Sequence, residues 1–112
     1  MPQAIRINQR GKVVASERAV SVSKSWGEDV LWVATGGGGP WTITFGKTSS
    51  EPSTYPVKPG SPFSKSTYTI VKGGSGGSTG GPKYGAVGNT YRYKVKDADG
   101  NVTDDPDIDI ES

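Results

Sequence analysis

Apolar and polar side chains alternate at every second position in several short stretches of the chain. The clearest stretch is 91–96, where Tyr91, Tyr93 and Val95 alternate with one arginine and two lysines. Successive side chains on a strand point to opposite faces, so this pattern predicts β-strands with one buried side. The same alternation surrounds further apolar sets: Ile5 and Ile7; Val20 and Val22; Trp41, Ile43 and Phe45; Tyr68 and Ile70; Ile108 and Ile110.

The residues Val30–Val33 follow a different pattern, because four apolar residues stand there without a polar one between them. A continuous apolar run predicts a central strand that is covered on both faces. Nowhere do apolar residues recur at the spacing of three and four that an amphipathic helix requires. The pattern as a whole therefore predicts an all-β sandwich.

Glycine and proline separate these stretches, and they are abundant, with 17 and 8 residues in a chain of 112. Four prolines lie in the segment 46–66, which we expect to be a long surface loop held by Tyr55 and Phe63. The segment 73–82 contains six glycines and is expected to be a flexible, linker-like loop. A chain of this length suits a single domain spanning residues 1–112.

The charges are distributed unevenly, although the net charge is only +2. All 13 lysines and arginines precede Asp97, whereas seven of the 11 carboxylates lie between Asp97 and Glu111. We expect the acidic last strand to pack beside a basic one. Binding to nucleic acid is disfavoured, because tracking phosphates requires clustered cations and the cations here are spaced singly.

The chain contains neither histidine nor cysteine. The usual general base near neutral pH and the best nucleophile are therefore both missing. Asp104 and Asp105 are adjacent, and adjacent residues on a strand point to opposite faces, so they do not form a catalytic carboxylate pair. We expect no enzymatic activity and no cofactor.

No apolar run approaches the roughly 18–20 residues that a membrane span needs. The first residues also lack the hydrophobic region of a signal peptide. The expectation is a soluble chain without a membrane span. Its compartment stays open between the cytoplasm and export after processing, because the absence of cysteine fits reducing and oxidising surroundings alike.

Four segments resemble, in order, motifs of the blue-copper proteins called cupredoxins. The corresponding family patterns are Gly-Asp-x-Val-x-Trp for 27–33, Pro-His-x-Val-x-Phe for 40–45, Ser-x-x-Phe-x-Ser for 61–64 and Gly-x-Thr-Tyr-x-Tyr for 88–93. The resemblance extends over residues 27–112 and implies a Greek-key β-sandwich of seven or eight strands. An immunoglobulin-like strand order is the alternative, since alternation fixes the faces of strands and not their order.

The copper ligands of that family are absent from this chain. Family members hold copper with two histidines, one cysteine and usually a methionine. Trp41 stands where the first histidine is expected, the loop 97–106 has none of the other three ligands, and Met1 is the only methionine. The resemblance therefore implies the fold without copper. Because Trp41 has the same strand phase as Ile43 and Phe45, we expect it to fill the volume that a metal site would leave. An exposed tryptophan that stacks on a ligand is the alternative.

The loop that follows the strand 91–96 is the only metal-like cluster in the sequence. Asp97, Asp99, Asn101 and Asp104 offer the oxygen ligands that calcium prefers. An EF-hand loop requires glycine at its sixth place, where this chain has Val102. The simpler interpretation is a tight hairpin turn around Asp-Gly-Asn, with weak calcium binding as the alternative.

Two classes of function remain for a non-catalytic sandwich. The first is a protein interaction or structural module that works through sheet edges or long loops, with a protein partner or self-association. The alternative is a glycan-binding module in which Trp26, Tyr55 or Tyr84 stacks on a sugar. Trp26 stands between Ser25 and Gly27 at an expected turn, which makes it the best candidate for an exposed ring, with hydrophobic anchoring of the turn as an equal alternative.

Overall fold

The computed structural model describes residues 2–46 and 57–112, and these residues form an all-β fold with eight strands and two short 3-10 helices. The strands are β1 (Pro2–Ile7), β2 (Ala19–Ser23), β3 (Asp29–Ala34), β4 (Trp41–Phe45), β5 (Thr67–Ile70), β6 (Thr90–Lys96), β7 (Val102–Asp104) and β8 (Asp107–Glu111). The helices are η1 (Ala15–Glu17) and η2 (Tyr84–Ala86). The all-β class predicted from the alternating pattern is confirmed.

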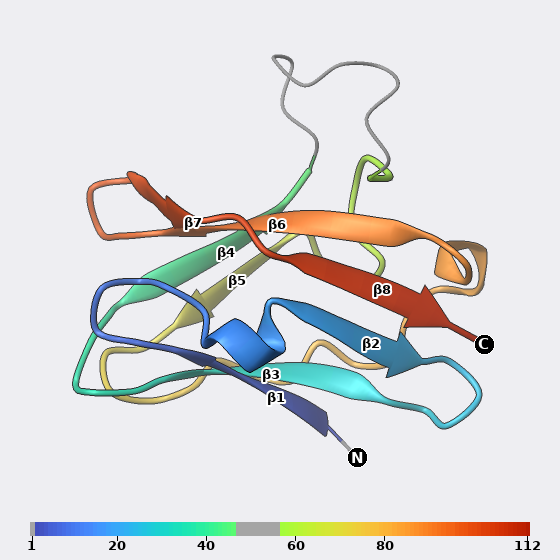
Figure 1. The fold of residues 1–112 in the computed structure, drawn as a ribbon, viewed down its shortest axis with the longest axis horizontal. Helices are drawn as coiled ribbons and strands as arrows, with labels where there is room; N and C mark the ends of the chain where they lie inside the picture. The colour runs from blue at the N-terminus through green and yellow to red at the C-terminus, as the bar shows by residue number, and fades with distance from the viewer. Residues whose placement is uncertain (1, 47–56) are drawn as a thin grey trace.

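The strands form two layers that enclose the core (Figure 1). One layer holds the parallel pair β1 and β3, and the larger sheet has the order β2-β8-β6-β4-β5, with β7 paired to β6. In the larger sheet β2 pairs parallel with β8, whereas the other neighbours are antiparallel. The chain therefore crosses from one sheet to the other between β1 and β2 and again between β2 and β3.

Alternation of buried with half-buried or exposed side chains follows the predicted phase in β4, β5, β6 and β8 of the larger sheet. In β6 the side chains of Tyr91, Tyr93 and Val95 are buried, and their neighbours face outward. Trp32 from the smaller sheet meets Tyr93 edge to face, with ring centroids 5.3 Å apart, and lies 6.1 Å from the ring of Phe45. Tilted contacts of this kind add to the energy of area burial and join the two sheets.

The prediction that β3 is covered on both faces is wrong. Val30, Trp32 and Ala34 are buried, but Leu31 and Val33 are only half-buried. In a fold of two layers, one face of β3 packs against the other sheet and its second face points toward solvent.

The glycine-rich segment 73–82, expected to be a linker-like loop, lies along the second edge of β3. The amide of Ala34 donates to the carbonyl of Gly74 at 2.7 Å, and the amide of Thr79 donates to the carbonyl of Val30 at 3.0 Å. A Cβ on Gly76 would lie 2.6 Å from the carbonyl oxygen of Thr69, so only glycine fits between the two sheets there. The segment closes the gap between β3 and β5.

The acidic last strand pairs with a basic one, as predicted. Strand β8 lies antiparallel to β6, with Arg92 opposite Asp107 and Thr90 opposite Asp109. The guanidinium of Arg92 is 2.9 Å from the carboxylate of Asp107, and the hydroxyl of Thr90 donates to Asp109 at 2.5 Å. Cross-strand pairs of opposite charge help to fix the register of these strands.

The long loop after β4 returns to the core near its end. Phe63 is fully buried and meets Phe45 edge to face at 5.9 Å, which confirms its predicted role as an anchor. Val57 is also buried, and the amide of Lys58 donates to the carbonyl of Thr90 at 2.8 Å. Tyr55, the other predicted anchor, lies outside the described residues.

Candidate functional site

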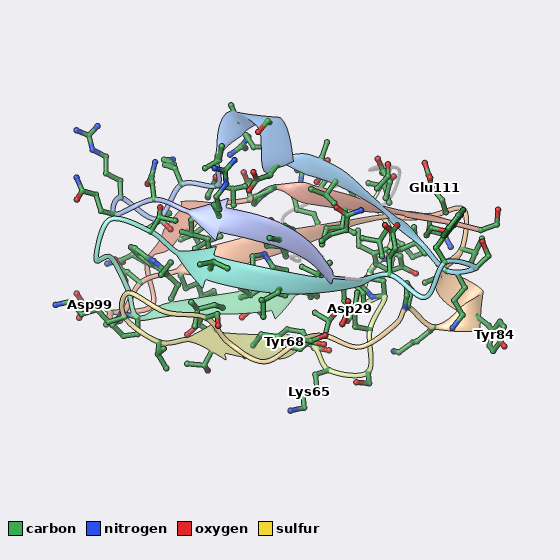
Figure 2. The ribbon with its side chains drawn as sticks, turned by 90° about the horizontal axis from the view of Figure 1, so that it is seen from below. Asp29, Lys65, Tyr68, Tyr84, Asp99 and Glu111 are labelled. Atoms are coloured by element: carbon green, nitrogen blue, oxygen red, sulfur yellow. The ribbon has the colours of Figure 1, made fainter. Side chains whose placement is uncertain are left out.

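The largest exposed apolar side chains gather at one end of the sandwich. Trp26 is 82% exposed and Tyr84 is 87% exposed. Trp26 lies in the turn between β2 and β3, and Tyr84 opens η2, and both of these segments lie beside the C-terminus (Figure 1). Figure 2 places Tyr84 at this end and Asp99 at the opposite end. We call the surface formed by Trp26, Tyr84 and Lys24 the aromatic end.

A tight turn places Trp26 in solvent. The amide of Gly27 donates to the carbonyl of Lys24 at 3.0 Å, and Gly27 has a φ of +64°, which favours glycine. The hydroxyl of Ser23 accepts from the amide of Trp26 at 3.3 Å, and the carboxylate of Glu28 accepts from the amide of Ser23 at 2.7 Å. These bonds fix the backbone of the turn, so its tip holds the indole ring away from the core.

Lys24 joins the Trp26 turn to Tyr84. Its ammonium lies 4.4 Å from the centroid of the Tyr84 ring and donates to the carbonyl of Pro82 at 2.6 Å. An exposed cation–π contact contributes about 0.5–1 kcal/mol, and the additional hydrogen bond restricts the lysine. One face of the Tyr84 ring is thus occupied. The arrangement holds an aromatic side chain in one position before any ligand arrives, which lowers the entropy lost on binding.

Trp41 lies at the opposite end and is only 6% exposed. It is the first residue of β4, and glycines from two loops approach its ring: a Cβ on Gly11, Gly38 or Gly39 would lie 2.9, 3.3 or 3.5 Å from it. The hydroxyl of Thr103 donates to the carbonyl of Gly11 at 2.8 Å and closes this packing. Trp41 therefore fills its end of the core, as the strand phase predicted.

Asp104, one of the calcium candidates, is buried in an ion pair. Its carboxylate accepts from the guanidinium of Arg18 and, at 2.8 Å, from the amide of Val13. Burial raises the pKa of Asp104, but the hydrogen bonds from Arg18, Val13 and Asp105 outweigh that effect and lower the pKa below its ordinary value. The carboxylate stays charged and ties the segment after β1 to β7.

The other calcium candidates belong to the turn between β6 and β7. The carboxylate of Asp97 accepts from the amides of Asp99 and Asn101 at 3.0 and 2.9 Å, and Gly100 has a φ of +84°. These bonds build the tight turn that the sequence predicts. Within residues 2–46 and 57–112, no group of three or more acidic side chains is placed to hold a metal ion, and Asp104 points elsewhere.

Of the three predicted stacking residues, the structure brings Trp26 and Tyr84 to the same end, while Tyr55 lies outside the described residues. The sequence did not single out Lys24, because its contacts with Tyr84 and Pro82 join parts of the chain that are far apart. The local sequence shows only that a lysine stands two residues before a tryptophan in an expected turn.

Comparison with known proteins assigns no family to the chain: no protein-family model, curated protein or solved structure matches it. In the part of the chain that the structure describes, no helix is long and apolar enough to cross a membrane.

Proposed function

We propose that this protein is a non-catalytic, copper-free cupredoxin-like module that binds a protein partner through its aromatic end. The observation that carries the proposal is the exposure of Trp26 and Tyr84 on neighbouring segments, which Lys24 of the Trp26 turn joins by its contact with the Tyr84 ring. Tryptophan and tyrosine are the residue types that dominate the binding energy of protein interfaces. A second copy of the chain is the first partner to test.

The strand arrangement supports the cupredoxin-like part of the proposal. Three of the segments that resemble the family coincide with β3, β4 and the start of β6. Trp41 has the sequence position of the family's first copper ligand and is buried with its ring close to Gly11. The carbonyl of Gly11 accepts from the hydroxyl of Thr103, which belongs to the segment 97–106 where the family carries its other ligands. An immunoglobulin-like sandwich consists of two antiparallel sheets, so the parallel pairs β1–β3 and β2–β8 favour the cupredoxin-like order.

The test uses a pair of double variants that remove exposed apolar side chains at opposite ends. Trp26→Ala/Tyr84→Ala removes the aromatic end, and Val71→Ala/Val102→Ala removes side chains that are 57% and 51% exposed elsewhere. Sedimentation velocity over a range of concentrations measures self-association. We expect the wild type and the valine variant to associate, and the aromatic variant to stay monomeric with a dissociation constant at least about 30-fold higher.

A wild type that stays monomeric excludes self-association and moves the test to foreign partners. Peptides selected from a displayed random library on the wild type should then lose binding to Trp26→Ala/Tyr84→Ala and keep binding to Val71→Ala/Val102→Ala. Selected peptides that bind both variants equally, or a failure to select any, contradict the proposal.

Glycan stacking is the second candidate, and the fixed position of the Tyr84 ring favours it. A sugar ring packs on a flat aromatic face, and a ring that is already held in place loses little freedom on binding. A glycan array probed with the wild type and with Trp26→Ala/Tyr84→Ala separates this candidate from protein binding. Only glycan stacking predicts that the wild type binds a glycan on the array and that the variant does not.

A further inference from the structure

The outward face of three neighbouring strands carries a regular array of threonine and lysine side chains. Thr42 and Thr44 on β4 alternate with buried residues and face outward. The strand register places Thr69 and Lys96 on either side of Thr42. In the same way, Thr67 and Lys94 flank Thr44. We call these two rows, Thr69-Thr42-Lys96 and Thr67-Thr44-Lys94, the threonine–lysine face.

Strand geometry fixes the spacing of the threonine–lysine face. Neighbouring strands lie about 4.8 Å apart, and side chains two residues apart on one strand are separated by about 6.7 Å. The face therefore presents two rows of hydroxyls, each of which has one ammonium group on its β6 side. Among the described residues neither Lys94 nor Lys96 forms an ion pair, whereas the next outward cation along β6, Arg92, pairs with Asp107.

A polar cleft extends the face at the β5 edge. The cleft has a volume of about 350 Å³ and is lined by Thr67 and Thr69 of the array, by Ser64, Lys65 and the largely buried Tyr68, and by the glycine-rich segment opposite. Figure 2 shows Lys65 at this edge, pointing away from the body of the protein, with Tyr68 beside it. On the far rim Ser78, which lines the cleft, donates to the carboxylate of Asp29.

We propose that the cleft and the threonine–lysine face together bind a linear acidic polysaccharide whose sugars carry carboxylates. The hydroxyl rows supply donors and acceptors for sugar hydroxyls, and Lys65, Lys94 and Lys96 supply three cations for carboxylates. The argument uses side chains other than those of the aromatic end and stands independently of the protein-binding proposal.

Two other polyanions fit this surface less well. Single-stranded nucleic acid binds through aromatic side chains on which bases stack, and the threonine–lysine face carries none. An acidic protein surface is held by buried aromatic or aliphatic anchors. The outward residues of β4, β5 and the part of β6 that pairs with β4 are threonines and lysines, and the apolar side chain that borders them, Val102 opposite Lys96, is small and not aromatic.

The test compares polygalacturonate with other polymers by biolayer interferometry on the whole chain. Lys94→Gln/Lys96→Gln removes the two array cations, and Lys12→Gln/Lys72→Gln removes two exposed lysines that belong neither to the array nor to the cleft lining, with the same change in net charge. We expect the first variant to bind polygalacturonate about tenfold more weakly and the second to bind like the wild type. Raising the salt concentration should weaken binding, because ions screen exposed charges.

A third variant tests the hydroxyl rows without changing charge. Thr42→Val/Thr44→Val keeps the shape and strand preference of both side chains while it removes their hydroxyls, and we expect it to weaken binding severalfold. Circular dichroism and melting temperature establish that each variant is folded.

Equal affinity of the Lys94→Gln/Lys96→Gln and Lys12→Gln/Lys72→Gln variants overturns the proposal, as does absence of polygalacturonate binding by the wild type. Binding of polyglutamate in place of polygalacturonate assigns the face to an acidic protein, and tighter binding of a DNA oligonucleotide assigns it to nucleic acid. Either outcome also overturns the proposal. Unchanged binding by Trp26→Ala/Tyr84→Ala is expected and separates this site from the aromatic end.

Discussion

The replacement of Trp41 by alanine is the strongest test of how the core is closed at the end opposite the aromatic end. A tryptophan buries about 150–250 Å², which corresponds to about 4–6 kcal/mol at about 25 cal/mol per Å². The glycines around the ring have no side chains that could move into the cavity, so little of this energy is recovered by collapse. The indole nitrogen has no hydrogen-bond partner among the described residues, and its removal returns about 1–3 kcal/mol.

The net expectation for Trp41→Ala is a loss of about 3 kcal/mol in the free energy of unfolding. For a domain of this size, that loss lowers the melting temperature by about 12 °C. Denaturant unfolding followed by circular dichroism measures the free energy, and calorimetry measures the melting temperature. Trp41→Phe is the matched control, because it keeps a ring in the cavity and removes the unpartnered N–H, and we expect it to lose about 1 kcal/mol or less.

The result for alanine decides whether Trp41 fills a structural volume. A free energy within about 0.5 kcal/mol of the wild type is typical of surface substitutions and would refute the reasoning. Equal losses for alanine and phenylalanine would also contradict it, because they would mean that the indole nitrogen, and not the volume of the ring, stabilises this end.

Three further predictions concern a glycine, an ion pair and an exposed ring. Gly11→Ala should lower the free energy of unfolding by about 2–4 kcal/mol in chemical unfolding, because the φ of Gly11 is +77° and a Cβ would lie 2.3 Å from the hydroxyl oxygen of Thr103. Gly27→Ala is the control, since Gly27 has a φ of +64° and no atom within 4 Å of an added Cβ, and it should lower the free energy of unfolding by only about 1–2 kcal/mol. The lowered pKa of Asp104 implies stability that is present above the ordinary value of 3.8 and lost as the pH falls through the lowered value. Asp104→Asn, which weakens the Arg18 contact, should lower the free energy of unfolding at pH 7 by about 1–3 kcal/mol and reduce its dependence on pH under acidic conditions, as measured by urea titrations. If the variant loses stability in acid as steeply as the wild type, the Arg18–Asp104 pair is not the cause of that loss. Acrylamide should quench one red-shifted emission component, and Trp26→Phe should abolish that component; persistence of the component would mean that another tryptophan is exposed.

The elements that could be predicted from the sequence are those whose signal is local. The alternation along β6 identifies both its extent and its inward face, because strand periodicity depends only on neighbouring residues. The tight turn ending in Gly27 is also a local signal, but it leaves exposure and hydrophobic anchoring of Trp26 equally open, and the structure shows exposure. The apolar run at 30–33 predicts a strand covered on both faces, and the structure shows one covered face. A run of apolar residues does not show whether other elements pack against one face of its sheet or against both.

The features that could not be predicted depend on contacts between distant parts of the chain. The composition of the glycine-rich segment indicates only that it forms no regular element, and its place beside β3 depends on the gap between β3 and β5. The contact of Lys24 with Tyr84, the pairing of Arg18 with Asp104 and the alignment of threonines across β4 and β5 all follow from strand order. Alternation does not determine strand order, so these parts of the candidate sites needed the three-dimensional structure.

Trp41 is buried at one end of the sandwich and Trp26 is exposed at the other, and this contrast distinguishes a tryptophan that stabilises the fold from one that is available for binding. Trp41 is covered by glycines and should contribute to folding, whereas Trp26 stands on a turn that its backbone hydrogen bonds already hold. Trp26→Ala should therefore leave the free energy of unfolding within about 0.5 kcal/mol of the wild type. Folding alone does not require an exposed indole beside a fixed tyrosine. If Trp26→Ala were as destabilising as Trp41→Ala, the aromatic end would be part of the folded core, and its proposed role in recognition would lose its support.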